Sequence, residues 1–252
     1  MQELYDEQYF QAYQDDPKRR EMYGQEYTRI MRYFEPLTKP GAYRMVLDVG
    51  CGLGQFLEWF PERNWERHGV EVSQYAQAVC KSKGIIMGWP KMDQIVDEHT
   101  GQFIQNIPAI PYDLVIFRGS LQHMQLPCAN LLSAHILLKP GGILAILATP
   151  DTESTCYRLW GTLPALNPAY NYHLFGARQL SNALEHMGFD VLDVEHPYRD
   201  TPYANPIKDK LRFASKLLTG RGPVPCWPGN MMEIYAMKGA NNYEVSYGDG
   251  DE

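Results

Sequence analysis

The stretch VLDVGCGLGQFL, Val46–Leu57, decides the fold of this 252-residue chain. A short apolar and β-branched run reaches Asp48, and glycines follow at alternate positions, Gly50, Gly52 and Gly54. This pattern is typical of a buried parallel strand that turns sharply into a helix. The glycines tolerate positive φ and leave no side chain between the backbone and a ligand. We therefore expect a ligand site at this turn, where helix-terminal N–H groups face a polar or anionic group and Asp48 accepts from a cationic one.

The glycine spacing bears on which ligand the turn binds. The dinucleotide pattern G-x-G-x-x-G needs a third glycine where this chain has Gln55. A glycine-rich turn that binds nothing is the plain alternative. Glu71 lies roughly 20 residues beyond the turn, at the end of the next predicted strand, where a carboxylate can accept both hydroxyls of a ribose. An exposed acid at a strand end is the simpler interpretation of Glu71, and a ribose alone does not separate one nucleoside cofactor from another.

Strand and helix patterns alternate along the rest of the chain. Together they predict an α/β fold with a doubly wound, mostly parallel sheet of seven strands, whose ligands bind at the carboxyl ends of the strands. The predicted strands are Arg44–Val49, His68–Val72, Ile85–Met87, Asp113–Phe117, Ile143–Ala148, Phe189–Val194 and Met232–Met237. The predicted helices begin at Gln55–Phe60 and then cover Gln74–Lys83, Lys91–His99, Asn130–Leu138 and Arg178–Met187.

The domain organisation follows from where this alternation stops. Residues 1–40 are rich in tyrosine and end at the breaker TKPG, which predicts an N-terminal helical segment. Its aromatic face either packs on the domain or caps a substrate mouth, and the two roles are compatible. One domain is expected over 41–240, with insertions at 151–177 and 195–230 that are candidates for substrate walls. Residues 241–252 read as a flexible acidic tail.

Composition limits the classes of partner. The chain has 23 Lys and Arg against 30 Asp and Glu, a net charge of −7, which argues against a nucleic-acid substrate. Its five cysteines are scattered without C-x-x-C spacing, which predicts a reduced cytoplasmic protein without a zinc site. No apolar run approaches the roughly 20 residues of a membrane span, and the acidic N-terminus is unlike a signal peptide. We expect a sugar or another small molecule as substrate; whether the chain forms a homodimer is left open.

Several motifs in their order along the chain resemble one superfamily. They are the D-V-G-C-G-x-G turn, YDLVIFRGSLQHM, LLKPGGILAILATP and ALEHMGFDVLDV. Over roughly residues 40–240 the chain resembles a class I S-adenosylmethionine-dependent methyltransferase, and its last segment, PCWPGNMMEIYAMK, resembles members of cell-surface sugar and small-molecule biosynthesis. The resemblance implies methyl transfer from S-adenosyl-L-methionine.

The resemblance also implies site residues. The glycine turn would hold the methionine part of the cofactor, Glu71 its ribose, and the residues after the second and fourth predicted strands the adenine and the sulfonium. This set is Asp48, Gly50, Cys51, Gly52, Gly54, Glu71, Val72, Ser73, Arg118 and Gly119. The acid that often follows the third strand in such enzymes is absent here or displaced to Asp93.

Methylation of a hydroxyl also needs a base. His123, in SLQHM, follows the fourth predicted strand and has a pKa near working pH. Sugar O-methyltransferases of this superfamily are similar in placing a histidine there and an acid after the fifth strand, which would be Asp151. His173, in NYHLF, is a second candidate base. For both histidines, a structural role in packing or in bonding the loop backbone is the alternative.

Other reactions fit less well. An NAD-linked oxidoreductase is disfavoured because this chain lacks the third glycine of the dinucleotide pattern. No metal is expected, because a magnesium site of the catechol type would need an acid where Phe117 and Arg118 stand. N- or C-directed methylation of a small molecule and a cofactor-binding scaffold without catalysis remain alternatives to O-methylation.

Overall fold

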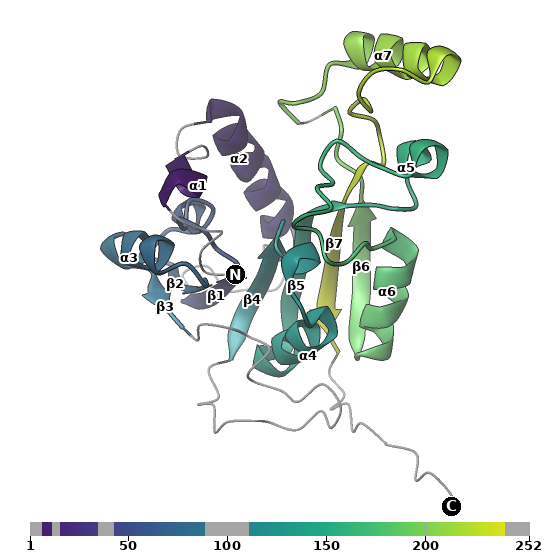
Figure 1. The fold of residues 1–252 in the computed structure, drawn as a ribbon. Helices are drawn as coiled ribbons and strands as arrows, with labels where there is room; N and C mark the ends of the chain where they lie inside the picture. The colour runs from purple at the N-terminus through teal and green to yellow at the C-terminus, as the bar shows by residue number, and fades with distance from the viewer. Residues whose placement is uncertain (1–6, 12–15, 35–42, 89–110, 200, 240–252) are drawn as a thin grey trace, which may run out of the picture.

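The computed structural model describes residues 7–11, 16–34, 43–88, 111–199 and 201–239. One seven-stranded sheet forms its centre, with strand order β3-β2-β1-β4-β5-β7-β6 (Figure 1). β7 runs antiparallel to β5 and β6, and the other paired strands are parallel. The predicted doubly wound, mostly parallel fold is thus confirmed. The strands are β1 (Arg44–Val49), β2 (Trp65–Val70), β3 (Ile86–Met87), β4 (Tyr112–Arg118), β5 (Leu138–Pro150), β6 (Phe189–Glu195) and β7 (Met231–Lys238).

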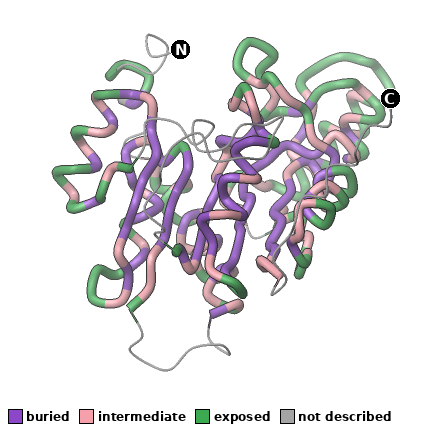
Figure 2. The backbone as a smooth tube through the Cα atoms, turned by 90° about the horizontal axis from the view of Figure 1, so that it is seen from below, coloured by how far each residue is buried: buried purple, intermediate pink, exposed green. Residues whose placement is uncertain are grey.

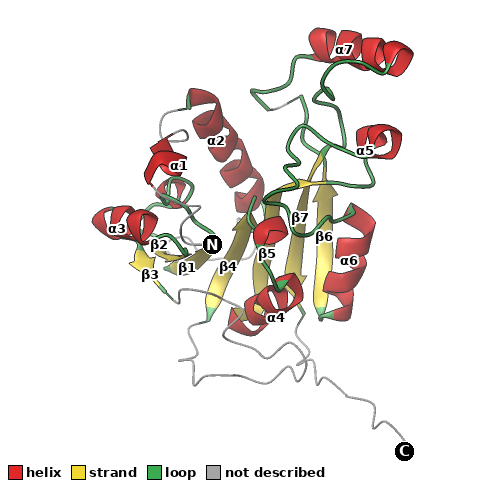
Figure 3. Ribbon diagram, in the orientation of Figure 1, coloured by secondary structure: helices red, strands yellow, loops and turns green. Residues whose placement is uncertain are grey.

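Helices lie on both faces of this sheet, as Figure 3 shows. They are α1 (Glu7–Gln11), α2 (Pro17–Met31), α3 (Gln74–Ser82), α4 (Pro127–Leu137), α5 (Thr155–Trp160), α6 (Ala177–His186) and α7 (Pro206–Thr219). α2 begins with favourable capping, because the Asp16 side chain accepts from the N–H of Lys18 and Pro17 stands at the first helical position. α3 is capped in the same way by Ser73.

The central strands are buried on both faces, so their sequences are nearly continuous apolar runs (Figure 2). Successive residues of β1 point to opposite sides: Leu47 belongs to a core with Leu131 and Leu184 of α4 and α6, whereas Val46 belongs to a core with Tyr23 and Ile30 of α2. α2 therefore seals one face of the sheet, while α4 and α6 seal the other.

The structure corrects the helix expected after the glycine turn. In place of a helix beginning at Gln55–Phe60, the chain forms one turn of 3-10 helix, η2 (Leu57–Trp59), and then reaches Pro61. Proline cannot continue a helix and disfavours the helical region for the residue before it, and β2 begins only four residues later. The helix dipole that we expected to face a ligand at this turn is therefore missing.

Smaller differences concern the ends of elements and the insertions. β2 begins at Trp65, before the predicted His68, and β5 begins at Leu138, where it pairs with Tyr112. The insertions at 151–177 and 195–230 contain α5 and α7, which we did not predict as separate elements. The predicted helix over Lys91–His99 lies outside the described residues. No helix of the described ranges has the length and apolar composition that would let it cross a bilayer.

Candidate active site

A cavity of about 370 Å³ lies at the carboxyl ends of β1, β2 and β4. Residues of α1 and α2 form its outer wall, and the glycine turn after β1 forms its floor. The predicted site residues that line it are Asp48, Gly50, Cys51, Gly52, Glu71, Val72, Arg118, Gly119 and His123. The other lining residues are Tyr9, Phe10, Arg19, Tyr23, Val49, Leu53, Gln55, Phe56, Val70, Ser120, Met124, Gln125 and Asn130.

The glycine turn needs its glycines for two physical reasons. Gly50, Gly52 and Gly54 have φ values of +82°, +54° and +71°, a region that side-chain-bearing residues rarely adopt. A Cβ on Gly50 would also lie 2.6 Å from the Cβ of Ser120. Gly54 faces away from the cavity, since a Cβ there would meet Ile85. Gly54 thus shapes the turn from behind, while Gly50 and Gly52 line the cavity.

Two buried carboxylates meet at this turn. One oxygen of Glu71 accepts from the N–H of Gly52 and the other from the N–H of Ser73, both at 2.9 Å. Ser73 itself caps α3 and does not line the cavity. Burial raises the pKa of Glu71, and these backbone donors oppose the rise. Glu71 therefore fixes the turn and also lines the space where we expected a ribose.

Asp48 is the buried carboxylate that lacks a complete set of partners. Its Oδ1 has no hydrogen-bond partner among the described residues. Burial raises its pKa to about 7; Arg118 opposes the rise, and the like charges of Glu71 and Glu26 add to it. A carboxylate that is buried and unpaired is costly unless a ligand completes it. A ligand with positively charged groups would do so.

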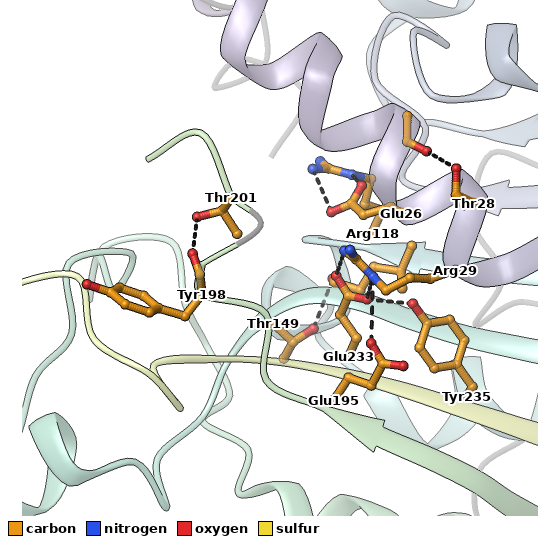
Figure 4. A network of polar contacts seen from close by, with 12 residues as sticks. Glu26, Thr28, Arg29, Arg118, Thr149, Glu195, Tyr198, Thr201, Glu233 and Tyr235 are labelled. Carbon is orange, nitrogen blue, oxygen red and sulfur yellow. Dashed lines mark hydrogen bonds and ion pairs between the residues drawn. The ribbon is translucent and has the colours of Figure 1, made fainter. Parts of the chain in front are cut away.

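Arg118 reaches the cavity from the end of β4 but does not present a free charge there. Glu26 of α2 binds its guanidinium with two hydrogen bonds, of 2.6 and 3.1 Å, and the ring of Tyr23 lies 4.3 Å beneath it (Figure 4). Burial would lower the pKa of Arg118, but Glu26 and Asp48 raise it, so the guanidinium stays charged. We did not anticipate Glu26 from the sequence; its signal was a carboxylate between Tyr23 and Tyr27 on an otherwise aromatic helix face.

A second ion pair of the same kind holds α2 farther along the sheet. Arg29 donates to both oxygens of Glu233 on β7, at 2.7 and 2.6 Å, and Tyr235 donates to the same carboxylate (Figure 4). Arg32 pairs with Glu195 at the end of β6. All five of these side chains lie outside the cavity lining. α2 is thus tied to β4 on one side and to β6 and β7 on the other.

His123 is the predicted base that lines the cavity. It ends the short 3-10 helix η4 (Leu121–His123) after β4, and its side chain is partly exposed. Its Nδ1 lies 2.7 Å from the carbonyl oxygen of Tyr170, and its Nε2 lies 3.4 Å from the amide nitrogen of Gln122. A carbonyl can only accept, so Nδ1 carries the proton and Nε2 keeps its lone pair.

The structure does not bring Asp151 and His173 to the cavity. The Oδ1 of Asp151 accepts from the N–H groups of Glu153 and Ala177, and its Oδ2 lies 2.9 Å from Nε2 of His196. Burial would raise the pKa of Asp151, but these hydrogen bonds together lower it. His173 Nε2 lies 3.2 Å from the carbonyl oxygen of Gln125. Both side chains therefore hold the loops after β5 in place.

The cavity fits S-adenosylmethionine on its own chemistry. An orphaned carboxylate oxygen, acidic side chains and side-chain-free backbone suit a ligand with two positive charges and a ribose. Within the described residues, no group of three metal-ligating side chains is placed to hold a metal ion. This strand order, with a glycine turn after β1 and an acid after β2, defines the Rossmann-like methyltransferases that use S-adenosylmethionine.

The comparison with family models agrees. Residues 10–194 match the model of a family described as a methyltransferase domain, so the chain belongs to that family and is an S-adenosylmethionine-dependent methyltransferase. Among curated proteins it is similar to the ubiquinone biosynthesis O-methyltransferase of Pseudomonas paraeruginosa, 29% identical over 107 residues. That match covers 40% of this chain and 42% of the Pseudomonas protein.

Solved structures share the fold at low identity. A methyltransferase from Archaeoglobus fulgidus has a TM-score of 0.55 and 21% identity, covering 87% of this chain and 94% of that one. The 1,6-didemethyltoxoflavin-N1-methyltransferase of Burkholderia thailandensis, solved with its substrate and S-adenosylhomocysteine, has a TM-score of 0.54 and 15% identity over 86% and 78% of the two chains. The match to the methyltransferase family model sets the dinucleotide alternative aside.

Proposed function

We propose that this enzyme methylates a hydroxyl group on a sugar or another small molecule, with His123 as the general base. The observation that carries the proposal is the fixed tautomer of His123. Nδ1–H donates a hydrogen bond to the carbonyl of Tyr170, so a basic Nε2 is kept at the edge of the cofactor cavity. A hydroxyl is a poor nucleophile until its proton is removed, whereas a neutral amine attacks with its own lone pair.

The bound cofactor supplies a methyl group on a positively charged sulfur, which leaves as a neutral thioether. The protein then has three tasks: to align the acceptor, to exclude water and to accept one proton. Aromatic side chains line the cavity and exclude water, and they offer a surface on which a ring of the cofactor or acceptor can stack. They are Tyr9, Phe10, Tyr23 and Phe56. The acceptor proton passes to Nε2 of His123, and the resulting imidazolium is stabilised by its hydrogen bond to Tyr170.

The matched curated relatives support a hydroxyl acceptor by their names, which describe O-methyltransferases. This chain spans less than half of their length, so their substrate does not transfer with the name. The specificity loop nearest to the base is the insertion at 151–177, because the N–H groups of Tyr172 and His173 both donate to the carbonyl of Gln122, next to His123. We propose that this insertion forms one wall of the acceptor site.

The test compares two histidines of one neighbourhood. Phenols, sugar nucleotides and amines serve as acceptors, and release of S-adenosylhomocysteine is measured. His123→Ala is expected to lower turnover on the active hydroxyl acceptor by about 10²–10⁴-fold, as for loss of a general base. His173→Ala, the matched control, is expected to keep turnover within about threefold of wild type. Its imidazole bonds the carbonyl of Gln125 and lies outside the cavity lining, so its loss removes one loop contact and no group at the cavity.

Calorimetry with S-adenosylhomocysteine separates catalysis from binding in this test. Both variants are expected to bind it as the wild type does. Unchanged turnover of His123→Ala, or transfer to amines with no transfer to any hydroxyl, would contradict the proposal.

A further inference from the structure

α7 exposes its apolar side chains to solvent. Leu218, Ile207 and Leu211 are 85%, 76% and 68% exposed, and Ala214 between them is exposed as well. Their spacing of four, three and four residues places all four on one stripe of the helix. An apolar stripe that long on the outside of a helix is unusual and marks an interaction surface.

The rotation of α7 is fixed by its opposite face. Asp209 is buried and accepts from the hydroxyl of Tyr198 and the N–H of Asn205. Phe213 stacks on Trp227 with ring centroids 4.2 Å apart, and Lys216 lies over the ring of Trp160. These contacts hold positions 209, 213 and 216 against the protein. The exposed stripe is therefore a consequence of packing on the other side.

Basic side chains flank this stripe. By helical spacing, Lys208 and Lys210 lie on either side of the stripe, whereas Lys216 lies on the packed face. From Pro206 to Arg221 the chain has five basic residues, Lys208, Lys210, Arg212, Lys216 and Arg221, against the single acid Asp209, which is buried. The whole chain has the opposite balance, 23 basic against 30 acidic residues. The positive charge beside the stripe is thus a local feature that selects a negatively charged partner.

We propose that α7 is an interfacial helix that docks on the surface of an anionic lipid bilayer. An amphipathic helix with large apolar residues on one side and lysine and arginine beside them inserts its apolar side at the level of the headgroups. Pairing of α7 with α7 of a second copy would bring the same basic flanks together, which the charge disfavours. α7 also stands beyond α5, away from the sheet, at the end of the molecule where α2 lies (Figure 1), so a flat surface can reach it.

The experiment is flotation of the full chain with vesicles. The wild type is expected to float with vesicles of phosphatidylcholine and phosphatidylglycerol in about equal parts, and to float much less with pure phosphatidylcholine or at about 0.5 M salt, where charge is screened. The triple variant Ile207→Ser, Leu211→Ser, Leu218→Ser is expected to lose binding by about tenfold or more, because the inserted side chains are gone.

Two further variants complete the design. Lys208→Glu with Lys210→Glu reverses the charge beside an intact stripe and is expected to weaken binding to the anionic vesicles as strongly. Leu192→Ser on β6 removes a leucine of 42% exposure elsewhere and is expected to bind as the wild type does. All variants should keep the melting temperature and the affinity for S-adenosylhomocysteine, since these side chains lie outside the cavity lining.

Three outcomes would overturn the proposal. The first is a wild type that floats with neither kind of vesicle. The second is equal flotation with neutral and anionic vesicles. The third is a wild-type dimer that the triple serine variant turns into a monomer while vesicle binding is absent, which would assign the stripe to a second copy.

Discussion

The carboxyl edge of the sheet has two halves that are built differently. After β1, β2 and β4 the connections turn at once, and their backbone and the carboxylates of Asp48 and Glu71 converge on one cavity. After β5 and β6 the connections are long, and the acid that follows β5, Asp151, accepts hydrogen bonds from the N–H groups of Glu153 and Ala177. In the first half, Asp48 keeps an oxygen without a hydrogen-bond partner among the described residues. Glu71 in the first half and Asp151 in the second both accept from backbone N–H groups and so fix their loops.

α2 crosses both halves and permits a direct comparison. Its Glu26 binds Arg118 inside the cavity, and its Arg29 binds Glu233 outside it, with the same two-pronged geometry. The second pair lies outside the cavity lining. The first pair contains a cation that lines the cavity, where we propose that the positively charged sulfur of the cofactor binds.

The largest expected effects come from breaking these two pairs. Glu26→Gln and Glu233→Gln each remove the carboxylate that binds a largely buried guanidinium with two hydrogen bonds, at an expected cost of about 3–5 kcal/mol in the free energy of unfolding, measured by urea denaturation; Arg29 keeps a longer contact with Glu195. Only Glu26→Gln should weaken S-adenosylmethionine relative to S-adenosylhomocysteine, by about tenfold in the ratio of their dissociation constants, because only the former carries a charged sulfur. An equal change of that ratio in both variants would remove the distinction between the pairs.

A glycine from each half gives the next comparison. Gly50→Ala meets Ser120 as well as an unfavourable positive φ, with an expected cost of about 3 kcal/mol in stability. Gly161→Ala, at the end of α5, has a similar φ of +65° but nothing within 4 Å of the new Cβ, so about 1 kcal/mol is expected. Denaturation measures the stability of both variants, and calorimetry measures their affinity for S-adenosylhomocysteine. Weaker binding by Gly161→Ala would contradict the expectation that only the first half of the edge forms the cofactor site.

Asp151→Ala tests whether the acid after β5 is structural. Its loss leaves two buried N–H groups unpaired, at an expected cost of about 1–3 kcal/mol, with cofactor affinity unchanged. Because the folded state lowers the pKa of Asp151, its stabilisation is present above the usual value of 3.8 and is lost as the pH falls through the lower folded value. Denaturation at several acidic pH values checks the sign. If Asp151→Ala lost turnover while keeping the stability of the wild type, Asp151 would instead take part in catalysis.

The smallest effect concerns Asp48 and pH. With a pKa of about 7 in the free enzyme, its carboxyl is mostly protonated at pH 6 and mostly ionised at pH 8. Since a cationic ligand prefers the carboxylate, affinity for S-adenosylmethionine is expected to rise by up to about tenfold over that range. Titration calorimetry on wild type and Asp48→Asn measures the difference, which should vanish in the variant. Parallel pH profiles would show that Asp48 does not titrate there.

The first half was predictable because its signals are local. The glycines, Asp48 and Glu71 lie within 24 positions of each other, and their spacing alone predicts a strand, a turn and an acid at the next strand end. The missing helix after the turn was also readable in principle, from Pro61. The role of Glu26 was not, because it depends on a contact with Arg118, 92 positions away, that no local pattern contains.

In the second half, the sequence predicted the strands but not the contacts that the side chains of the long loops make. The apolar runs of β5, β6 and β7 predicted their positions to within a few residues. Asp151 was a catalytic candidate through the resemblance and His173 a second candidate base; the structure shows both side chains bonded to backbone groups of neighbouring loops. α7 escaped notice because its apolar stripe has the helical period expected of a packed helix, and sequence does not tell which side faces the protein.

The pair between Arg29 and Glu233 joins positions 204 residues apart. The outer wall of the active site is made at the ribosome before any strand of the sheet, yet one of its anchors arrives only with β7, the last strand. Closing so long a stretch of chain is entropically slow, so the wall can settle only after β7 has been made. Catalytic competence is then the final event of folding, and a nascent chain that stops short of β7 would have its Rossmann-like strands without a finished pocket.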